Sequence, residues 1–220
     1  MKTHNKFKLA IFDMDGLLID SELHWGKFAL LLWKELDVPY SQSLLRDSLG
    51  LKTEDMFKMV KSKYYPKLSV VNARRIHGKY KKVVYGKSNL LKGAVKLLKD
   101  VSKSGMPVAL ASSSSFESID IVLRKHNIKN MFNVIFSTAS MRLPGKPSPA
   151  VYTKLIKKFK LSPKEVVIFE DSGVGVASAK GSGAKVIAVP DKRWSHGNFS
   201  SADLIAKSLA DKNVYKFLGL

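Results

Sequence analysis

Acidic side chains follow two of the short apolar runs in the sequence, where strands of a sheet would end. Asp13 and Asp15 come directly after the first run. Glu170 and Asp171 follow a later one. Ligands of open α/β sheets bind at the carboxyl ends of the strands, so these four carboxylates are expected to meet in one crevice. There they would repel one another and raise each other's pKa unless a cation lay among them.

The other polar residues at strand ends indicate what such a crevice binds. Oxygen ligands without His or Cys favour a hard cation, Mg²⁺ above all. Ser112 ends a further apolar run, and Lys146 lies in a Gly-Lys-Pro loop before a helix that Ser148 would cap, with Pro149 in its first position. A phosphoryl group requires a lysine and a hydroxyl beside a cation. The residues therefore predict a phosphate site with a carboxylate placed to attack the phosphorus.

Short apolar runs alternate with amphipathic stretches along most of the chain. The runs are continuously apolar, which indicates strands buried on both faces, and this β–α–β order predicts a parallel sheet covered by helices. We therefore expect an α/β fold with a doubly wound parallel sheet and a Rossmann-like core. Strands are expected at 9–12, 107–111, 134–136, 166–169 and 186–189, and helices near 92–103, 116–127, 149–159 and 174–182.

One segment departs from this alternation. From Ser21 to about Gly86 the apolar residues recur only with helical spacing, as at Phe28, Leu31 and Leu32. This pattern predicts an all-helical domain inserted after the first strand. The expected division is a core domain of residues 1–18 and 88–220 and a helical cap domain of residues 19–87.

Composition excludes several classes of protein. The chain has 220 residues and no cysteine, which excludes disulfides, thiolate catalysis and metal sites built on sulfur. Its longest apolar run, Phe28 to Trp33, is far below the roughly 18 residues that a membrane helix needs. The N-terminal run at 9–12 is too short for a signal peptide. We expect a soluble, cytoplasmic protein that does not bind membranes.

The chain is strongly basic. It has 38 Lys and Arg against 18 Asp and Glu, a formal net charge of +20, and no acidic residue between Met56 and Lys99. Such a field favours a phosphorylated small molecule, a nucleic acid or an acidic membrane as partner, although dispersed lysines can also be a solvated surface. No known nucleic-acid-binding motif is present, so nucleic acid is not the expected partner.

Four motifs occur in one order along the chain. They are Asp13-Met-Asp15-Gly-Leu-Leu-Ile-Asp-Ser-Glu, Ser112, Lys146 in Gly-Lys-Pro-Ser-Pro, and Glu170-Asp171-Ser-Gly-Val-Gly. In this order, and with a helical segment between the first two, the sequence resembles the haloacid dehalogenase superfamily over nearly its whole length. It is most similar to the branch that holds sugar-phosphate phosphatases and beta-phosphoglucomutases, with a helical cap.

The resemblance implies a role for each catalytic residue. Asp13 would be the nucleophile that forms an aspartyl-phosphate. Asp15 would be the acid that protonates the leaving oxygen and the base that then activates water. Ser112 would hold the phosphoryl oxygens, and Lys146 would neutralise charge on the nucleophile and the phosphate. An anionic nucleophile attacks an anionic phosphate only when such positive charge offsets their repulsion.

The resemblance also implies a Mg²⁺ site and contacts to substrate. Asp13, Asp171 and the backbone carbonyl of Asp15 would bind the ion, and Glu170 would support it directly or through water. Trp25 is open to two interpretations, a platform for substrate or part of the cap core. The residues expected to contact substrate are Gly16, Ser113, Ser114, Lys52 and Trp25.

Two departures distinguish a phosphatase from a mutase within this branch. Beta-phosphoglucomutases carry an arginine in the cap where this chain has Thr53, and Ser-Lys-Asn after the second motif where it has Ser114-Ser115-Phe116. Both departures remove groups that would bind a second phosphate, although Lys52 could partly replace the arginine.

The expected protein is therefore a Mg²⁺-dependent phosphatase. It would act as a monomer on a small anionic phosphorylated metabolite, such as a hexose or 2-deoxyhexose phosphate. A mutase is the alternative, followed by a nucleic-acid-binding protein built on the same core.

Overall fold

The structure, a computed structural model, describes residues 6–48 and 53–220 and divides into two compact units. The core unit comprises Met1–Asp20 and Asn89–Leu220, and the helical unit comprises Ser21–Ser88. The sequence predicted a helical domain of residues 19–87. It therefore placed the first boundary two residues too early and the second boundary one residue too early.

The core unit is built on a six-stranded parallel sheet with the order β3-β2-β1-β4-β5-β6. Ile11 of β1 lies opposite Ala109 of β2 and Ile168 of β4. The residues of the three central strands are buried along their whole length, as their continuous apolar runs predicted. The strands are β1 (Leu9–Phe12), β2 (Val108–Ser112), β3 (Val134–Ser137), β4 (Val166–Glu170), β5 (Lys185–Ala188) and β6 (Leu204–Ile205).

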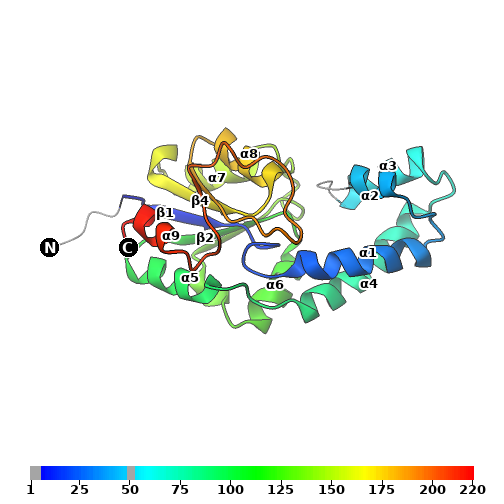
Figure 1. The fold of residues 1–220 in the computed structure, drawn as a ribbon, viewed down its shortest axis with the longest axis horizontal. Coiled ribbons are helices and arrows are strands. Elements are labelled where there is room, and N and C mark those ends of the chain that lie inside the picture. The colour runs from blue at the N-terminus through cyan, green and yellow to red at the C-terminus, as the bar shows by residue number, and fades with distance from the viewer. Residues whose placement is uncertain (1–5, 49–52) are drawn as a thin grey trace. The chain divides into compact units, whose positions relative to one another are not determined.

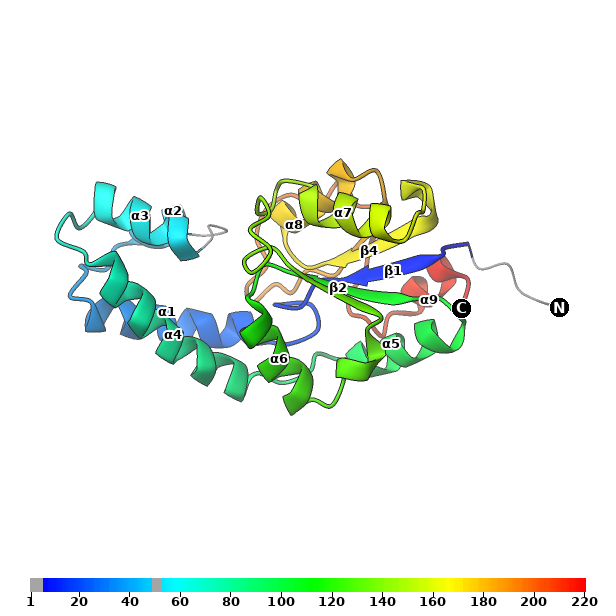
Figure 2. The same ribbon diagram turned by 180° about the vertical axis from the view of Figure 1, so that it is seen from behind.

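Helices cover both faces of this sheet, which confirms the doubly wound α/β fold. In Figures 1 and 2, α7 and α8 lie on one face and α5, α6 and α9 on the other. Because the strand order reverses at β1, which lies between β2 and β4, the carboxyl end of β1 is a topological switch point, where such folds bind ligands. The helices are α5 (Ala94–Lys103), α6 (Phe116–Lys125), α7 (Ala150–Lys158), α8 (Gly173–Gly181) and α9 (Lys212–Leu218), with short 3₁₀ turns η1 (Lys129–Met131) and η2 (Pro163–Glu165).

In the core unit one local prediction is wrong and one strand was missed. Ser148 does not cap α7 with Pro149 in the first turn; the Pro149 carbonyl accepts the first helical bond, from Thr153 N at 2.9 Å, and the helix begins one residue later. The strand β6 was not predicted, because two residues are too few for a periodic signal. The side chain of Asp203, just before β6, reinforces the pairing of β6 with β5 by accepting a hydrogen bond from Val186 N at 2.9 Å.

The helical unit has its own apolar core. Its helices are α1 (Ser21–Glu35), α2 (Gln42–Ser48), α3 (Thr53–Lys63) and α4 (Val70–Lys87). The two long helices α1 and α4 pack along each other, and α3 packs against α4. Trp33 of α1 meets Phe57 of α3 edge to face, with ring centroids 6.1 Å apart. The described residues of this unit contain no strand, so the inserted domain is all-helical as expected.

Within the described ranges, none of the helices combines the length and the apolar character that a membrane span requires.

Candidate active site

Three carboxylates meet at the switch point. Asp13 follows β1, Glu170 ends β4 and Asp171 comes next. The backbone N–H of Asp13 donates to the Phe169 carbonyl at 3.1 Å, which extends the β1–β4 pairing and brings both acidic strand ends together. One carboxylate oxygen from each of the three lies within 4.8 Å of the others, and the residues are only 4%, 0% and 5% exposed.

One lysine forms ion pairs with two of these carboxylates. The Lys146 Nζ lies 2.5 Å from Asp13 Oδ1 and 2.5 Å from Glu170 Oε1. Burial raises the pKa of Asp13 to about 8; Lys146 opposes this shift, whereas Glu170 adds to it. Burial disfavours the charged ammonium, but Asp13 and Glu170 outweigh this and raise the pKa of Lys146 well above its usual value. The cluster thus has more negative charge than this one cation balances.

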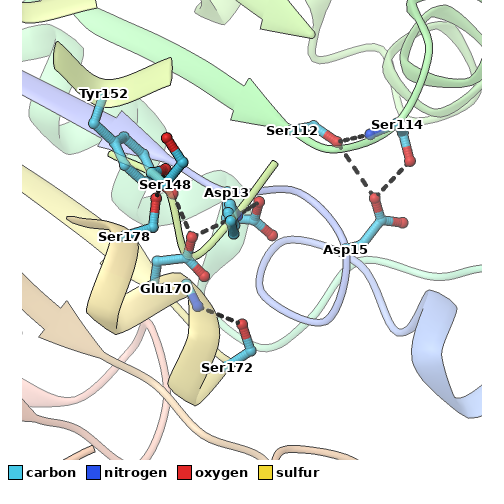
Figure 3. Close-up of polar contacts among 11 residues, drawn as sticks. Asp13, Asp15, Ser112, Ser114, Ser148, Tyr152, Glu170, Ser172 and Ser178 are labelled. Carbon is cyan, nitrogen blue, oxygen red and sulfur yellow. Dashed lines mark hydrogen bonds and ion pairs between the residues drawn. The ribbon is translucent and has the colours of Figure 1, made fainter. Parts of the chain in front are cut away.

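Tyr152 is the fifth polar residue of this cluster, and it was not predicted from the sequence. Its hydroxyl donates to Glu170 Oε1 (Figure 3). Burial, with Glu170 as a second cause, raises the pKa of Tyr152 well above its usual value, so the hydroxyl keeps its proton. Tyr152 lies six residues after Lys146 on the buried face of α7, where an aromatic residue is hard to distinguish by pattern from ordinary core.

Two glycines allow backbone to approach the carboxylates. Gly16 has φ +77°, and a Cβ there would overlap the Asp171 carboxylate. A Cβ at Gly175, in the first turn of α8, would overlap the Glu170 carboxylate. Both positions need glycine for space, and Gly16 needs it for its backbone as well. The predicted contact of Gly16 with substrate stays a prediction.

Asp15 lies apart from the three clustered carboxylates. Its Oδ2 accepts hydrogen bonds from Ser114 Oγ at 3.0 Å and Ser112 Oγ at 3.4 Å (Figure 3). All four carboxylates were expected to meet, but the Asp15 side chain instead binds the serines after β2. Its predicted roles as acid and base, and as a ligand through its carbonyl, stay predictions.

The remaining expected substrate contacts are spread over both units. Ser113 is exposed after β2, and Ser114 binds Asp15 as described. Trp25 belongs to the helical unit, where its ring stacks on His77 with centroids 4.9 Å apart and planes 8° apart. Both interpretations of Trp25, as a platform for substrate and as part of the cap core, stay predictions. Lys52 lies outside the described residues.

The acidic cluster fits a divalent cation. Its side-chain ligands would all be carboxylate oxygens, the donors that Mg²⁺ prefers. The Glu170 Oε2 is buried and has no hydrogen-bond partner in the described part of the chain. A buried carboxylate oxygen without a partner is costly, and a cation or its bound water would satisfy it. Asp13, Glu170 and Asp171 are therefore the side chains that could hold the ion.

Comparisons with known proteins identify the family of the chain. The sequence profile of the haloacid dehalogenase-like hydrolase family matches residues 10–189. Hexitol phosphatase B of Escherichia coli K12 is 31% identical over 229 residues, covering 100% of each chain. The phosphorylated carbohydrates phosphatase of Thermotoga maritima is 30% identical over 182 residues, covering 81% of this chain and 82% of its own.

Among solved structures, the Rhodobacter sphaeroides protein CbbY in complex with phosphate superposes with a TM-score of 0.79. The match covers 93% of this chain and 95% of that one at 23% identity, and it supports the fold.

Proposed function

Because the chain belongs to the haloacid dehalogenase-like hydrolase family and is a phosphatase within it, we propose that it hydrolyses sugar phosphates with Mg²⁺ through an aspartyl-phosphate at Asp13. The observation that carries this proposal is the Lys146 bridge between Asp13 and Glu170, 2.5 Å to each, in a buried cluster of three carboxylates. This arrangement provides a nucleophile, a fixed positive charge and oxygen ligands within a few ångströms.

Asp13 is the nucleophile of the proposed first step. Its carboxylate attacks the phosphorus, an O–P bond forms, and the bond from phosphorus to the sugar oxygen breaks. Lys146 offsets the charge of both the nucleophile and the phosphoryl group. Because burial raises the pKa of Asp13 to about 8 in the protein alone, added positive charge is needed to keep this carboxylate ionised at neutral pH.

Asp15 is the proton carrier of both steps. It donates a proton to the leaving sugar oxygen, then takes one from the water that attacks the aspartyl-phosphate and releases phosphate. The hydrogen bonds from Ser112 and Ser114 hold its side chain toward the loop after β2. The Ser112 hydroxyl would also hold the phosphoryl oxygens.

The cation would be held by Asp13, Asp171 and the carbonyl of Asp15, with Glu170 in support. When bound, Mg²⁺ supplies positive charge that stabilises the phosphoryl group in the transition state. The unpartnered Glu170 Oε2 supports this assignment.

The substrate class follows from the relatives. Hexitol phosphatase B and the phosphorylated carbohydrates phosphatase are named for phosphorylated sugars and sugar alcohols. We therefore place hexose, 2-deoxyhexose and hexitol phosphates first among the substrates of this protein. The formal net charge of +20 suits such dianionic ligands.

Phosphate release from a panel of sugar phosphates, nucleotides and p-nitrophenyl phosphate tests this function. We expect steady release from one or a few sugar monoesters, lost with EDTA and restored by Mg²⁺. Conversion of beta-glucose 1-phosphate to glucose 6-phosphate without net release would instead establish the mutase. If no phosphoryl group moves and salt-sensitive binding to RNA or DNA is found, the enzymatic proposal fails.

A further inference from the structure

Tyr152 makes a hydrogen bond that the proposed chemistry does not use directly. It lies in the first turn of α7 and is fully buried, and its hydroxyl donates to Glu170 Oε1. The face of its ring lies 5.7 Å from Lys146 Nζ. Tyr152 therefore contacts both members of the Lys146–Glu170 ion pair, and its hydroxyl and the lysine share one carboxylate oxygen.

The other side of the Glu170 carboxylate is closed by backbone. Gly175 approaches it so closely that a Cβ would overlap the carboxylate oxygens. Ser172 fixes this turn of α8, because its hydroxyl accepts a hydrogen bond from Gly175 N at 3.1 Å (Figure 3). The carboxylate is thus held between two donors on Oε1 and the backbone of α8, which restricts its rotation.

The start of α7 is itself attached to α8. The hydroxyl of Ser178 donates to the Ser148 carbonyl at 2.6 Å, and Pro149 lies against Gly181. Tyr152 follows within one turn, so its hydroxyl reaches Glu170 from a segment that is attached to α8. A buried donor on a fixed element is suited to hold a charged group in one orientation.

We propose that Tyr152 is a positioning residue of the cation site: by donating to Oε1 it fixes the orientation of the Glu170 carboxylate beside Asp13 and Asp171. This inference rests on the proposed function, because it assigns Tyr152 to the Mg²⁺ site of that function. Partners that orient ligating groups typically change metal affinity by about 10-fold to 100-fold when removed. Phenylalanine fills nearly the same volume, so Tyr152→Phe removes the hydroxyl with little change in packing.

Mg²⁺ titration followed by calorimetry and by the rise in Tm tests the proposal without relying on turnover. For Tyr152→Phe we expect the Mg²⁺ dissociation constant to rise at least about tenfold, and the Mg²⁺-induced Tm increase to shrink accordingly. The matched control is Tyr80→Phe, which removes a hydrogen bond of the same kind, from Tyr80 to Glu35 Oε2 at 2.7 Å, in the helical unit. The control should leave the Mg²⁺ constant unchanged.

A double-mutant cycle with Glu170→Gln shows whether Tyr152 acts through Glu170. The effect of Tyr152→Phe on Mg²⁺ binding should largely disappear in the Glu170→Gln background. If Tyr152→Phe lowers the metal-free Tm but binds Mg²⁺ as the wild type does, Tyr152 only packs and the inference is overturned. If the wild type itself fails to bind Mg²⁺, the cation of the proposed function is wrong, and Tyr152 loses this role with it.

Discussion

At the level of single residues, the chemistry depends on how four buried polar side chains share charge. Lys146 contacts Asp13 and Glu170 together, and Tyr152 donates to the same oxygen of Glu170. Asp15 is kept apart by its bonds to serines. The two aspartates of the first motif thus lie in different surroundings, which suits one as nucleophile and the other as proton carrier.

Replacing the nucleophile should abolish turnover. Asp13→Asn keeps the size of the side chain but removes the charge that attacks phosphorus, so we expect kcat to fall by more than about a hundredfold. Phosphate release under saturating substrate and Mg²⁺ measures this loss. Asp120→Asn, on the surface helix α6, is the control and should retain full activity. Activity of Asp13→Asn above about a hundredth of wild type would show that another residue attacks.

Ser114 should affect the step in which Asp15 donates its proton. Ser114→Ala removes the 3.0 Å hydrogen bond to Asp15 Oδ2, and we expect kcat/KM for a sugar phosphate to fall about tenfold. The loss should be smaller for p-nitrophenyl phosphate, whose leaving group needs no proton. Ser62→Ala, at an exposed position of α3, is the control. Equal losses for both substrates would remove Ser114 from the positioning of Asp15.

The residues at strand ends could be located from sequence, but their partners could not. Asp13, Glu170 and Asp171 each follow an apolar run, and the parallel sheet requires such ends to meet. The pairing of Asp15 with Ser114 depends on how the loop after β2 turns, and Tyr152 resembles ordinary helix core. Neither contact leaves a periodic pattern in the chain.

At the level of elements, each unit depends on a few buried polar or aromatic contacts. In the core unit, the pairing of β1 with β4 continues to Asp13 and so sets the spacing of the acidic strand ends. In the helical unit, His77 of α4 packs between Trp25 of α1 and Phe57 of α3. The central strands were predictable from their continuous apolar runs and the helical insertion from apolar residues at helical spacing, whereas the two-residue β6 was not predictable.

His77 should make the stability of the protein depend on pH. Burial, with Lys81 nearby, lowers the pKa of His77 to about 4 from 6.5. Between these pH values the unfolded chain binds a proton at His77 that the folded chain does not bind. His77 therefore does not reduce the free energy of unfolding above about pH 6.5, and it reduces it progressively as the pH falls toward 4. Over that window the loss from this group is roughly 2–3 kcal/mol.

Denaturant unfolding at pH 7 and pH 4.5 measures this effect. His77→Phe keeps an aromatic ring against Trp25 and cannot titrate, so its free energy of unfolding should fall less between the two pH values than that of the wild type. Because both proteins contain the same carboxylates, the difference between their losses of unfolding free energy measures the contribution of His77. An equal fall in the two proteins would mean that His77 is not buried in its neutral form.

At the level of the whole molecule, two units with separate cores carry a strong positive charge. The formal net charge of +20 was readable from composition, and the helical insertion into the sheet was readable from the spacing of apolar residues. Composition also left the partner open among phosphorylated metabolites, nucleic acid and membranes. The buried carboxylate–lysine cluster and the family of the chain favour a phosphorylated metabolite, because a site of this kind acts on a single phosphoryl group.

The net charge should attract substrate over a distance. We expect kcat/KM for a dianionic sugar phosphate to fall severalfold as NaCl is raised from about 0.02 M to about 0.2 M, because salt screens the field that concentrates the ligand. The kcat should change little, since the buried cluster is screened much less. Steady-state kinetics at constant Mg²⁺ measure both constants. A kcat/KM that does not depend on salt would show that the basic surface plays no part in substrate capture.

In the proposed mechanism the phosphoryl group is transferred to Asp13 before water releases it. Mass spectrometry of an acid-quenched reaction tests this most directly, with the Asp15→Asn variant used to slow release of the phosphoryl group. We predict one added phosphoryl group per chain, on the peptide that contains Asp13 and at that residue, and none in the Asp13→Asn variant. A phosphoryl group on another residue, or turnover by a protein in which Asp13 is never modified, would contradict the account.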